Sequence, residues 1–231
     1  MKDTLFQPAE RPETLGSTVL MQIKDLLLSG HLMPGEQLSL RSTASALGVS
    51  VMPVREAVNQ LVADQALEVT PSRAVRVPVM TSEQFTEITQ IRIEIEGYAV
   101  AQACARISAQ TIAELEELNR KLAAAMDAGA SNNDIVSFNK DLHFAAYAAS
   151  QMPMLVKIIQ TLWLRIGPIL NYDLRNGSER IQNKTAVIHH AQMIAGLKAG
   201  DAQMARLGLS NDIHSAFEHI MAKHYASPEG R

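Results

Sequence analysis

Several features that would point to a secreted or membrane protein are missing from the chain. It has a single cysteine, Cys104, so neither a disulfide within the chain nor a four-thiolate zinc site can form. Its apolar runs are shorter than a membrane span, and residues 1–13 have neither the basic start nor the apolar core of a signal peptide. We therefore expect a cytoplasmic protein with no membrane partner.

Excess positive charge is missing as well. The net charge is −3, and residues 1–80 carry seven Lys or Arg against eight Asp or Glu. Because nucleic-acid-binding proteins usually display a basic patch or stripe, any affinity for DNA must come from the placement of individual arginines. At 231 residues, of which 47% are hydrophobic, the chain is long enough for two modest domains.

The most informative stretch is residues 41–69. Two short helical patterns flank a compact turn at residues 47–50, which is the spacing of a helix-turn-helix. We expect Ser50 to cap the second helix by accepting a backbone N–H through its side-chain oxygen. Apolar residues at steps of three and four turn one stripe of that helix inward and leave Arg55 and Asn59 on the opposite face.

The flanking segments complete a winged helix. Residues 14–29 have the apolar spacing of a supporting helix. Two short extended segments, 67–69 and 75–79, enclose a turn and predict a hairpin wing that carries Arg73 and Arg76.

Residues 32–69 resemble the winged-helix domain of the GntR family of bacterial transcription regulators. The resemblance lies in the Pro-Gly turn, the Leu-Gly-Val-Ser turn and the Pro-Val-Arg-Glu-Ala recognition helix. It implies that Arg41, Arg55 and Arg73 contact DNA. The family usually carries Arg-Gly at the wing tip, whereas Ala74 follows Arg73 here, and alanine tolerates a positive φ less well than glycine.

The candidate DNA-binding residues are therefore Arg41, Ser50, Arg55, Asn59, Arg73 and Arg76. An arginine on a recognition helix can bond two guanine acceptors at once in the major groove. Since one recognition helix reads only a few base pairs, we expect a homodimer on a palindromic double-stranded operator.

No strand pattern recurs after the joint at residues 78–81, where Thr81 and Gln84 resemble a capping box. Six helical segments are predicted, at residues 82–107, 111–128, 132–149, 153–174, 179–199 and 201–225. We expect Thr111 and Glu114 to form the capping box of the second segment.

The predicted fold class is thus mainly α, with an N-terminal winged helix-turn-helix, a small β-hairpin wing and a C-terminal all-α bundle of about six helices. The predicted division of the chain is a flexible arm at 1–13, a DNA-binding domain at 14–79 and a helical domain at 80–231 that binds an effector and dimerises.

Residues 82–225 are similar to the all-helical, ligand-sensing FCD domain of the FadR subfamily. The similarity lies in Arg92 with Glu96, in Leu142-His143 and in the stretch from His190 to Asp201. Many FCD domains bind a divalent metal through an aspartate and three histidines. The corresponding positions in this sequence are Asn139, His143, His190 and Asp212.

The residue types at these positions can be weighed without the family. Asn139 and His143 are one helical turn apart, and two imidazoles with a carboxylate suit zinc, nickel or manganese. Asparagine is a weaker ligand than the expected aspartate. His214 rivals Asp212, but two residues turn a helix by about 200°, so only one of them can face a pocket. The alternative is that the histidines are core residues held by hydrogen bonds, without a metal.

The resemblance implies a small carboxylate effector bound by Arg92, Asn139, His143 and His190. Arg92 is a bidentate carboxylate clamp if it points inward, or a helix-surface salt bridge if it pairs with Glu96 one turn along. Asn171, Tyr172 and Arg175 near the end of a long helix are further candidates for the pocket lining.

Taken together, the sequence predicts a ligand-responsive transcription regulator, a repressor, rather than an enzyme. The alternative is a metal-dependent hydrolase that uses His143, His190 and Asp212. The sequence contains no nucleophile motif and no glycine-rich phosphate loop that would support this alternative.

Overall fold

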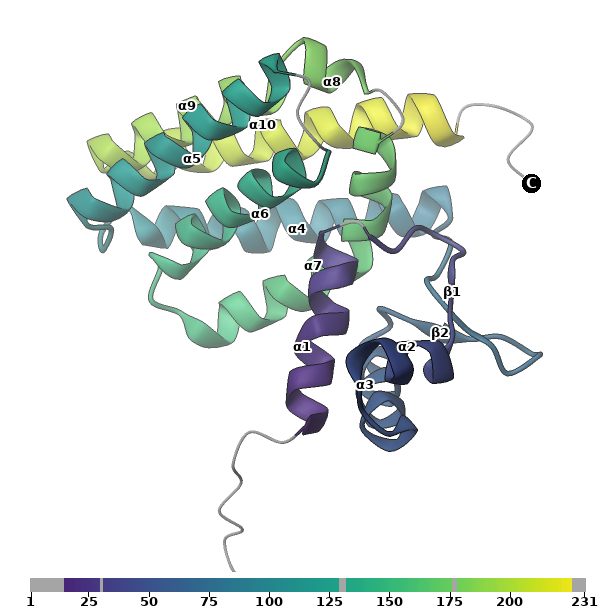
Figure 1. The fold of residues 1–231 in the computed structure, drawn as a ribbon. Coiled ribbons are helices and arrows are strands. Elements are labelled where there is room, and N and C mark those ends of the chain that lie inside the picture. The colour runs from purple at the N-terminus through teal and green to yellow at the C-terminus, as the bar shows by residue number, and fades with distance from the viewer. Residues whose placement is uncertain (1–14, 30, 129–131, 176–177, 226–231) are drawn as a thin grey trace, which may run out of the picture.

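The computed structural model describes residues 15–29, 31–128, 132–175 and 178–225 (Figure 1). Its N-terminal part consists of a supporting helix, a helix-turn-helix and a small sheet. The predicted arm at 1–13 lies outside the described residues. The elements are α1 (Leu15–Leu28), β1 (Gln37–Leu38), α2 (Leu40–Leu47), α3 (Val51–Ala63), β2 (Glu68–Val69) and β3 (Val75–Arg76). Helix α3 packs on α1 and α2 through its apolar stripe, which includes Val54, Val58 and Leu61.

The wing is an antiparallel sheet in the order β1-β3-β2, in which Arg76 lies opposite both Gln37 and Glu68. The positive φ of its turn falls on Arg73, at 64°, and not on Ala74, where the sequence suggested a conflict. The backbone N–H groups of both residues donate to Thr70, Arg73 to its carbonyl oxygen and Ala74 to its side-chain oxygen. A tight turn therefore forms without glycine.

The predicted helix caps are partly right. Thr81 and Gln84 form the capping box of α4. Ser50 occupies the N-cap of α3, but the prediction that its side chain accepts a capping hydrogen bond is wrong among the residues described. The predicted Thr111 box is also wrong, because the helix starts two residues earlier, after Ser108, whose side chain accepts from the Thr111 N–H.

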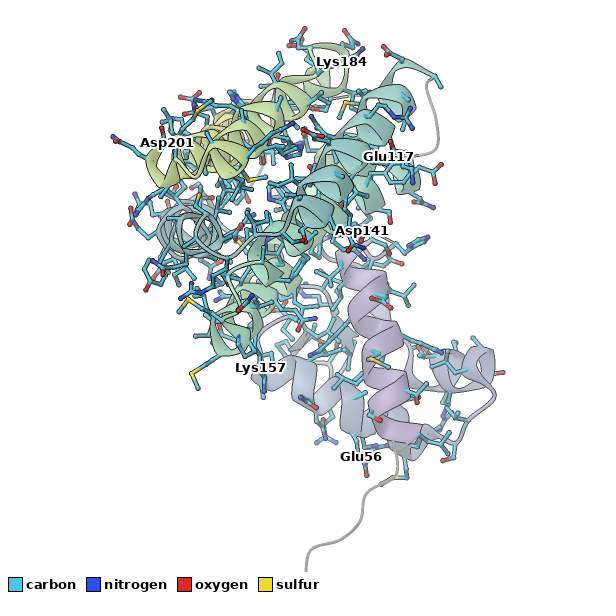
Figure 2. All side chains as sticks on the ribbon, turned by 90° about the vertical axis from the view of Figure 1, so that its left-hand side faces the viewer. Glu56, Glu117, Asp141, Lys157, Lys184 and Asp201 are labelled. Atoms are coloured by element: carbon cyan, nitrogen blue, oxygen red, sulfur yellow. The ribbon has the colours of Figure 1, made fainter. Side chains whose placement is uncertain are left out.

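The C-terminal part is all-helical over the described residues. Its elements are α4 (Ser82–Ala103), α5 (Ala109–Asp127), α6 (Asn132–Ala148), α7 (Pro153–Arg175), α8 (Glu179–Gln182), α9 (Thr185–Ala199), α10 (Ala202–Ile220) and a π-helical turn (Met221–Tyr225). The helix predicted at 179–199 is broken because Lys184 adopts φ 49°, which separates α8 from α9. Figure 2 shows charged side chains such as Asp141 and Lys157 on the outside of this bundle.

Helix α7 passes the length and hydropathy test for a membrane span over Pro153–Leu174, which the sequence reading did not anticipate. The core helix of a water-soluble bundle passes the same test. Here α7 packs against α1, α4 and α6 and buries Ile159, Trp163 and Ile166. These contacts use part of its apolar surface, since 33% of the segment is buried and Met154 and Ile158 are exposed.

The two parts of the chain meet where α1 packs on α7. The Asn171 side-chain N–H of α7 donates to the Leu28 carbonyl of α1 at 3.2 Å. One helical turn earlier, a Cβ at Gly167 would lie 3.1 Å from the Leu27 carbonyl oxygen. At the joint before α4, the Tyr225 hydroxyl donates to the Met80 carbonyl at 2.8 Å. The supporting helix is thus held by the helical part of the chain.

Helices α9 and α10 pack backbone to backbone. A Cβ at Gly208 would lie 2.4 Å from the Met193 nitrogen, and one at Gly196 would lie 2.3 Å from the Ala205 nitrogen. Only glycine allows this approach, and each replaced hydrogen would force the helices apart.

We expect Gly208→Ala to lower the free energy of unfolding by about 1–3 kcal/mol, because overpacking outweighs the gain in helix propensity. The matched control is Gly97→Ala, where the added Cβ meets only the flexible Arg206 side chain at 3.1 Å. Urea unfolding of both variants checks this prediction. Equal stabilities for the two variants would contradict it.

Candidate functional site

Five of the six candidate DNA-binding side chains lie on the surface. Ser50, Arg55 and Asn59 are exposed on α3 or at its start, Arg41 is exposed on α2, and Arg73 is exposed at the wing tip. The buried stripe of α3 faces α1, so the arginine side of the helix is turned outward. This is the orientation that a recognition helix requires.

Arg76 differs from the other five. Its Nε donates to Glu68 Oε1 across the wing at 2.5 Å, and its side chain is 41% exposed. A half-exposed ion pair of this kind contributes about 0–1 kcal/mol. A phosphate group would therefore compete with Glu68 for Arg76 at little cost.

The second site lies inside the helical part, where three helices bring together three potential metal ligands. His143 comes from α6, His190 from α9 and Asp212 from α10, and all three are buried. The close approach of α9 and α10 explains two of them. Gly208 lies one turn before Asp212, and the residue it touches, Met193, lies three residues after His190.

The spacing of the ligand atoms fits a metal. His143 Nε2 lies 3.2 Å from Asp212 Oδ2 and 3.1 Å from His190 Nε2, and His190 Nε2 lies 3.6 Å from Asp212 Oδ2. Tetrahedral ligands with bonds of about 2.0–2.2 Å lie about 3.3–3.6 Å apart. Three such ligands leave a fourth position, and Asn139, one turn before His143, lines the same pocket.

The protonation states also suit a cation. Burial lowers the pKa of His143, against the opposing effect of Asp212, so its imidazole is neutral at pH 7. Burial alone would raise the pKa of Asp212, but the imidazoles of His190 and His143 outweigh burial and hold that pKa well below its ordinary value. Asp212 Oδ1 is buried and has no hydrogen-bond partner among the described residues.

His214 is excluded as a ligand by its position. Its side chain is exposed and pairs with Glu218 at 3.2 Å, one turn along α10. Asp212 lines the pocket and His214 does not, which agrees with the expectation that only one of them can face it.

Arg92 is neither a free carboxylate clamp nor a helix-surface salt bridge, the two alternatives that the sequence left open. It pairs with Glu96 through Nε at 2.6 Å and Nη2 at 3.2 Å, but this pair is buried and not on the helix surface. Its guanidinium carbon also lies 5.1 Å from the centre of the Trp163 ring. Burial lowers the pKa of Arg92, and Glu96 more than compensates, so the net effect raises the pKa and the guanidinium stays charged. Arg92 lines the pocket with two of its donors already engaged.

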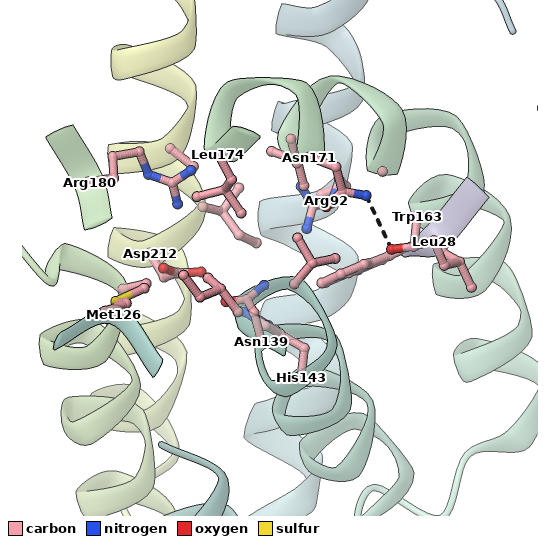
Figure 3. Close-up of a pocket in the computed structure, with 17 residues that line it drawn as sticks. Leu28, Arg92, Met126, Asn139, His143, Trp163, Asn171, Leu174, Arg180 and Asp212 are labelled. Atoms are coloured by element: carbon pink, nitrogen blue, oxygen red, sulfur yellow. Dashed lines mark hydrogen bonds and ion pairs between the residues drawn. The ribbon is translucent and has the colours of Figure 1, made fainter. Parts of the chain in front are cut away.

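The pocket beside the ligands combines apolar and polar groups (Figure 3). It is lined among others by Leu28, Asn139, Trp163, Asn171, Leu174 and Arg180. Asn171 was expected here. Tyr172 is exposed instead, and the side chain of Arg175 lies outside the described residues. His190 is not among the residues that line this pocket.

Two contributors could not be expected from the sequence. Leu28 belongs to the N-terminal part, and Arg180 lies on the short α8, yet both reach the pocket. Arg180 also forms an ion pair with the buried Asp173 at 3.7 Å. His219, which the sequence suggested was ordinary surface, lies 3.3 Å from the same carboxylate.

Comparison with known proteins decides the family. Residues 15–77 match the bacterial regulatory proteins of the gntR family, and residues 87–215 match the FCD domain. The chain belongs to the GntR family, with an FCD domain. It is 38% identical over 184 residues to the HTH-type transcriptional regulator McbR of Escherichia coli K12, covering 80% of this chain and 82% of McbR.

Two further comparisons agree. A solved structure of E. coli McbR/YncC superposes with a TM-score of 0.83 and 34% identity, covering 90% of this chain and 98% of that one. A probable D-xylose utilization operon transcriptional repressor of Paenarthrobacter nicotinovorans is 26% identical, covering 85% of this chain and 86% of that protein. These relatives are transcription regulators and not enzymes, so the hydrolase alternative is wrong.

A metal measurement tests the ligand set of this GntR regulator. We expect untagged protein incubated with zinc and desalted to keep about one ion per chain, because three preformed ligands converge. Asp212→Asn should lose the ion, since it removes the only anionic ligand. Elemental analysis measures the content.

The matched control for this prediction is His214→Gln on the same helix, which should keep the ion. Wild-type protein that emerges metal-free would contradict the expectation.

Proposed function

We propose that this GntR regulator represses genes from a palindromic operator as a cytoplasmic homodimer, and that a small carboxylate in the FCD pocket changes its operator affinity. One observation carries the proposal. Leu28 of α1, the helix on which α3 packs, lines the FCD pocket, and its carbonyl accepts a hydrogen bond from the pocket residue Asn171. Pocket and DNA-reading helix are thus separated by a single helix.

The proposed DNA-binding domain spans 14–79, and the proposed effector and dimerisation domain spans 80–231. Within the first, Arg55 and Asn59 enter the major groove, where arginine bonds guanine and asparagine bonds adenine. Arg41, Ser50, Arg73 and Arg76 contact phosphates beside the groove. The outward orientation of α3 supports this assignment.

The proposed dimer surface lies on α4 and α10, which pack against each other. Ile91 and Tyr98 lie two turns apart on one face of α4 and are exposed, and Leu207 of α10 is exposed beside them. Between them Glu94 pairs with Arg206 at 2.5 Å. An apolar patch with a charged pair suits a two-fold contact, which would hold two recognition helices about 34–36 Å apart.

The effector is proposed to be an organic acid because of the polar groups in the pocket. A divalent ion held by His143, His190, Asp212 and Asn139 would supply a Lewis-acid anchor for a carboxylate. Arg180 Nε is buried there without a hydrogen-bond partner in the described chain, which leaves it available to an anion. Trp163 and Leu28 would contact the carbon skeleton, so the same ligand touches both parts of the protein.

Arg55→Ala should weaken operator binding by about 5–150-fold, the value of one bidentate base contact of about 1–3 kcal/mol. Fluorescence anisotropy at a fixed salt concentration measures it, with an operator obtained by genomic selection. Arg120→Ala, an exposed arginine on α5 paired with Glu117, is the control and should bind normally. Unchanged affinity in Arg55→Ala would remove the key contact.

Asn171→Ala should separate carboxylate binding in the pocket from its effect on operator affinity. Carboxylates that bind the pocket are found by a thermal-shift screen, and operator affinity is then measured with and without the best one. We expect the variant to bind the carboxylate within a few-fold of wild type, while the carboxylate-dependent change in operator affinity falls toward none, because α1 loses its bond to the pocket.

Asn119→Ala is the matched control, since Asn119 is a buried asparagine that donates to the Val187 carbonyl within the helical part at 3.1 Å. It should lose similar stability and keep full coupling. Coupling that survives in Asn171→Ala would contradict the proposed route.

A further inference from the structure

A chain of buried hydrogen bonds runs from His143 away from the metal-ligand cluster. The His143 Nδ1 atom lies 2.9 Å from the Tyr147 hydroxyl, one turn along α6. The Tyr147 hydroxyl bonds Glu96 of α4, and both Glu96 oxygens are held by Arg92. All four side chains are at most 4% exposed. Water therefore has little access to this chain.

The direction of each bond follows from the chemistry of its members. A carboxylate paired with a guanidinium only accepts hydrogen bonds, so the Tyr147 hydroxyl must donate to Glu96. A phenol is protonated at neutral pH, so this proton stays on Tyr147. Because Tyr147 donates its proton to Glu96, its hydrogen bond with His143 Nδ1 needs a proton on Nδ1. The neutral imidazole of His143 therefore carries its proton on Nδ1.

This tautomer leaves the Nε2 lone pair of His143 facing the cluster. Nε2 lies 3.2 Å from Asp212 Oδ2, which is also an acceptor. Two acceptors at this distance repel each other unless a cation or a proton lies between them. His190 Nε2, 3.1 Å from His143 Nε2, can supply such a proton in the metal-free protein, and a divalent cation bound between the three ligand atoms would replace it.

We propose that Tyr147, Glu96 and Arg92 act as positioning residues that fix His143 as an Nε2 ligand for a divalent metal. The proposal rests on the metal site in the proposed function and assigns these residues a role that the sequence reading did not. It also gives Arg92 a task other than clamping the effector, since two of its donors hold Glu96. A hydrogen bond to the second nitrogen of a ligating histidine orients the ring and raises its basicity.

Tyr147→Phe is the decisive variant, because it removes one hydroxyl and keeps the ring in the core. We expect its zinc affinity, measured by competition with a chromophoric chelator on the full-length protein, to fall about 10–100-fold. Tyr172→Phe, at an exposed tyrosine on α7, is the control and should bind zinc normally. A folded Tyr147→Phe protein with zinc affinity within two-fold of wild type would overturn the proposal.

A second readout separates positioning from general loosening of the core. The ¹⁵N chemical shifts of the His143 imidazole in zinc-free protein report which nitrogen carries the proton. We expect the Nδ1–H form in wild type and a shift toward the Nε2–H form in Tyr147→Phe. Should that variant not fold, Glu96→Gln serves instead, because the glutamine amide can donate to Tyr147 and so reverse the direction of that hydrogen bond.

The metal site and the hydrogen-bond chain can be disproved separately. Wild-type protein that binds no zinc would overturn the metal part of the proposed function and, with it, the ligand role of His143. The Nε2–H form of His143 in wild type would overturn the hydrogen-bond chain even if zinc binds.

Discussion

The contact between α1 and α7 is the constraint on which the rest of the structure depends. At Gly167 the two helices approach so closely that a Cβ would press on the Leu27 carbonyl, and one turn later Asn171 bonds the Leu28 carbonyl. Helix α1 also packs against α3, whose outer face carries Arg55. Helix α1 therefore connects α7 with the recognition helix. Because packed interfaces shift between discrete arrangements and do not deform continuously, a small change in the pocket can have a large effect at the DNA.

The interior of the helical part is unusually rich in charge. The Arg92–Glu96 pair is buried, and losing one partner of such a pair costs about 3–5 kcal/mol. The three-residue ligand cluster adds an anionic carboxylate and two imidazoles a few ångströms away. An apolar core would be cheaper to form, so these groups are explained better by ligand binding than by stability. The glycine contact between α9 and α10 serves the same end, because it lets His190 and Asp212 approach.

Much of this could be predicted from the sequence. Apolar periodicity and turn residues identified the helix-turn-helix, the wing and the long helices, and residue spacing showed that only one of Asp212 and His214 can face the pocket, without saying which. The failures have local causes. Lys184 adopts a positive φ that no residue pattern indicated, and Ser108 caps α5 three residues before the expected cap, Thr111. The contribution of Leu28 to the pocket depends on how two separately folded parts meet, which periodicity does not encode. Tyr147 could have been found, since it lies four residues after His143 on the same helix face.

We infer that a ligand in the pocket changes operator affinity through α1. Amide hydrogen exchange on DNA-free protein measures this. It compares protein without ligands with protein saturated with zinc and a pocket-binding carboxylate. We expect altered exchange in the last two turns of α1, around Ile23 and Leu28, together with protection of pocket segments in α6 and α7. Protection confined to α6, α7 and α10, with exchange in α1 unchanged, would contradict it.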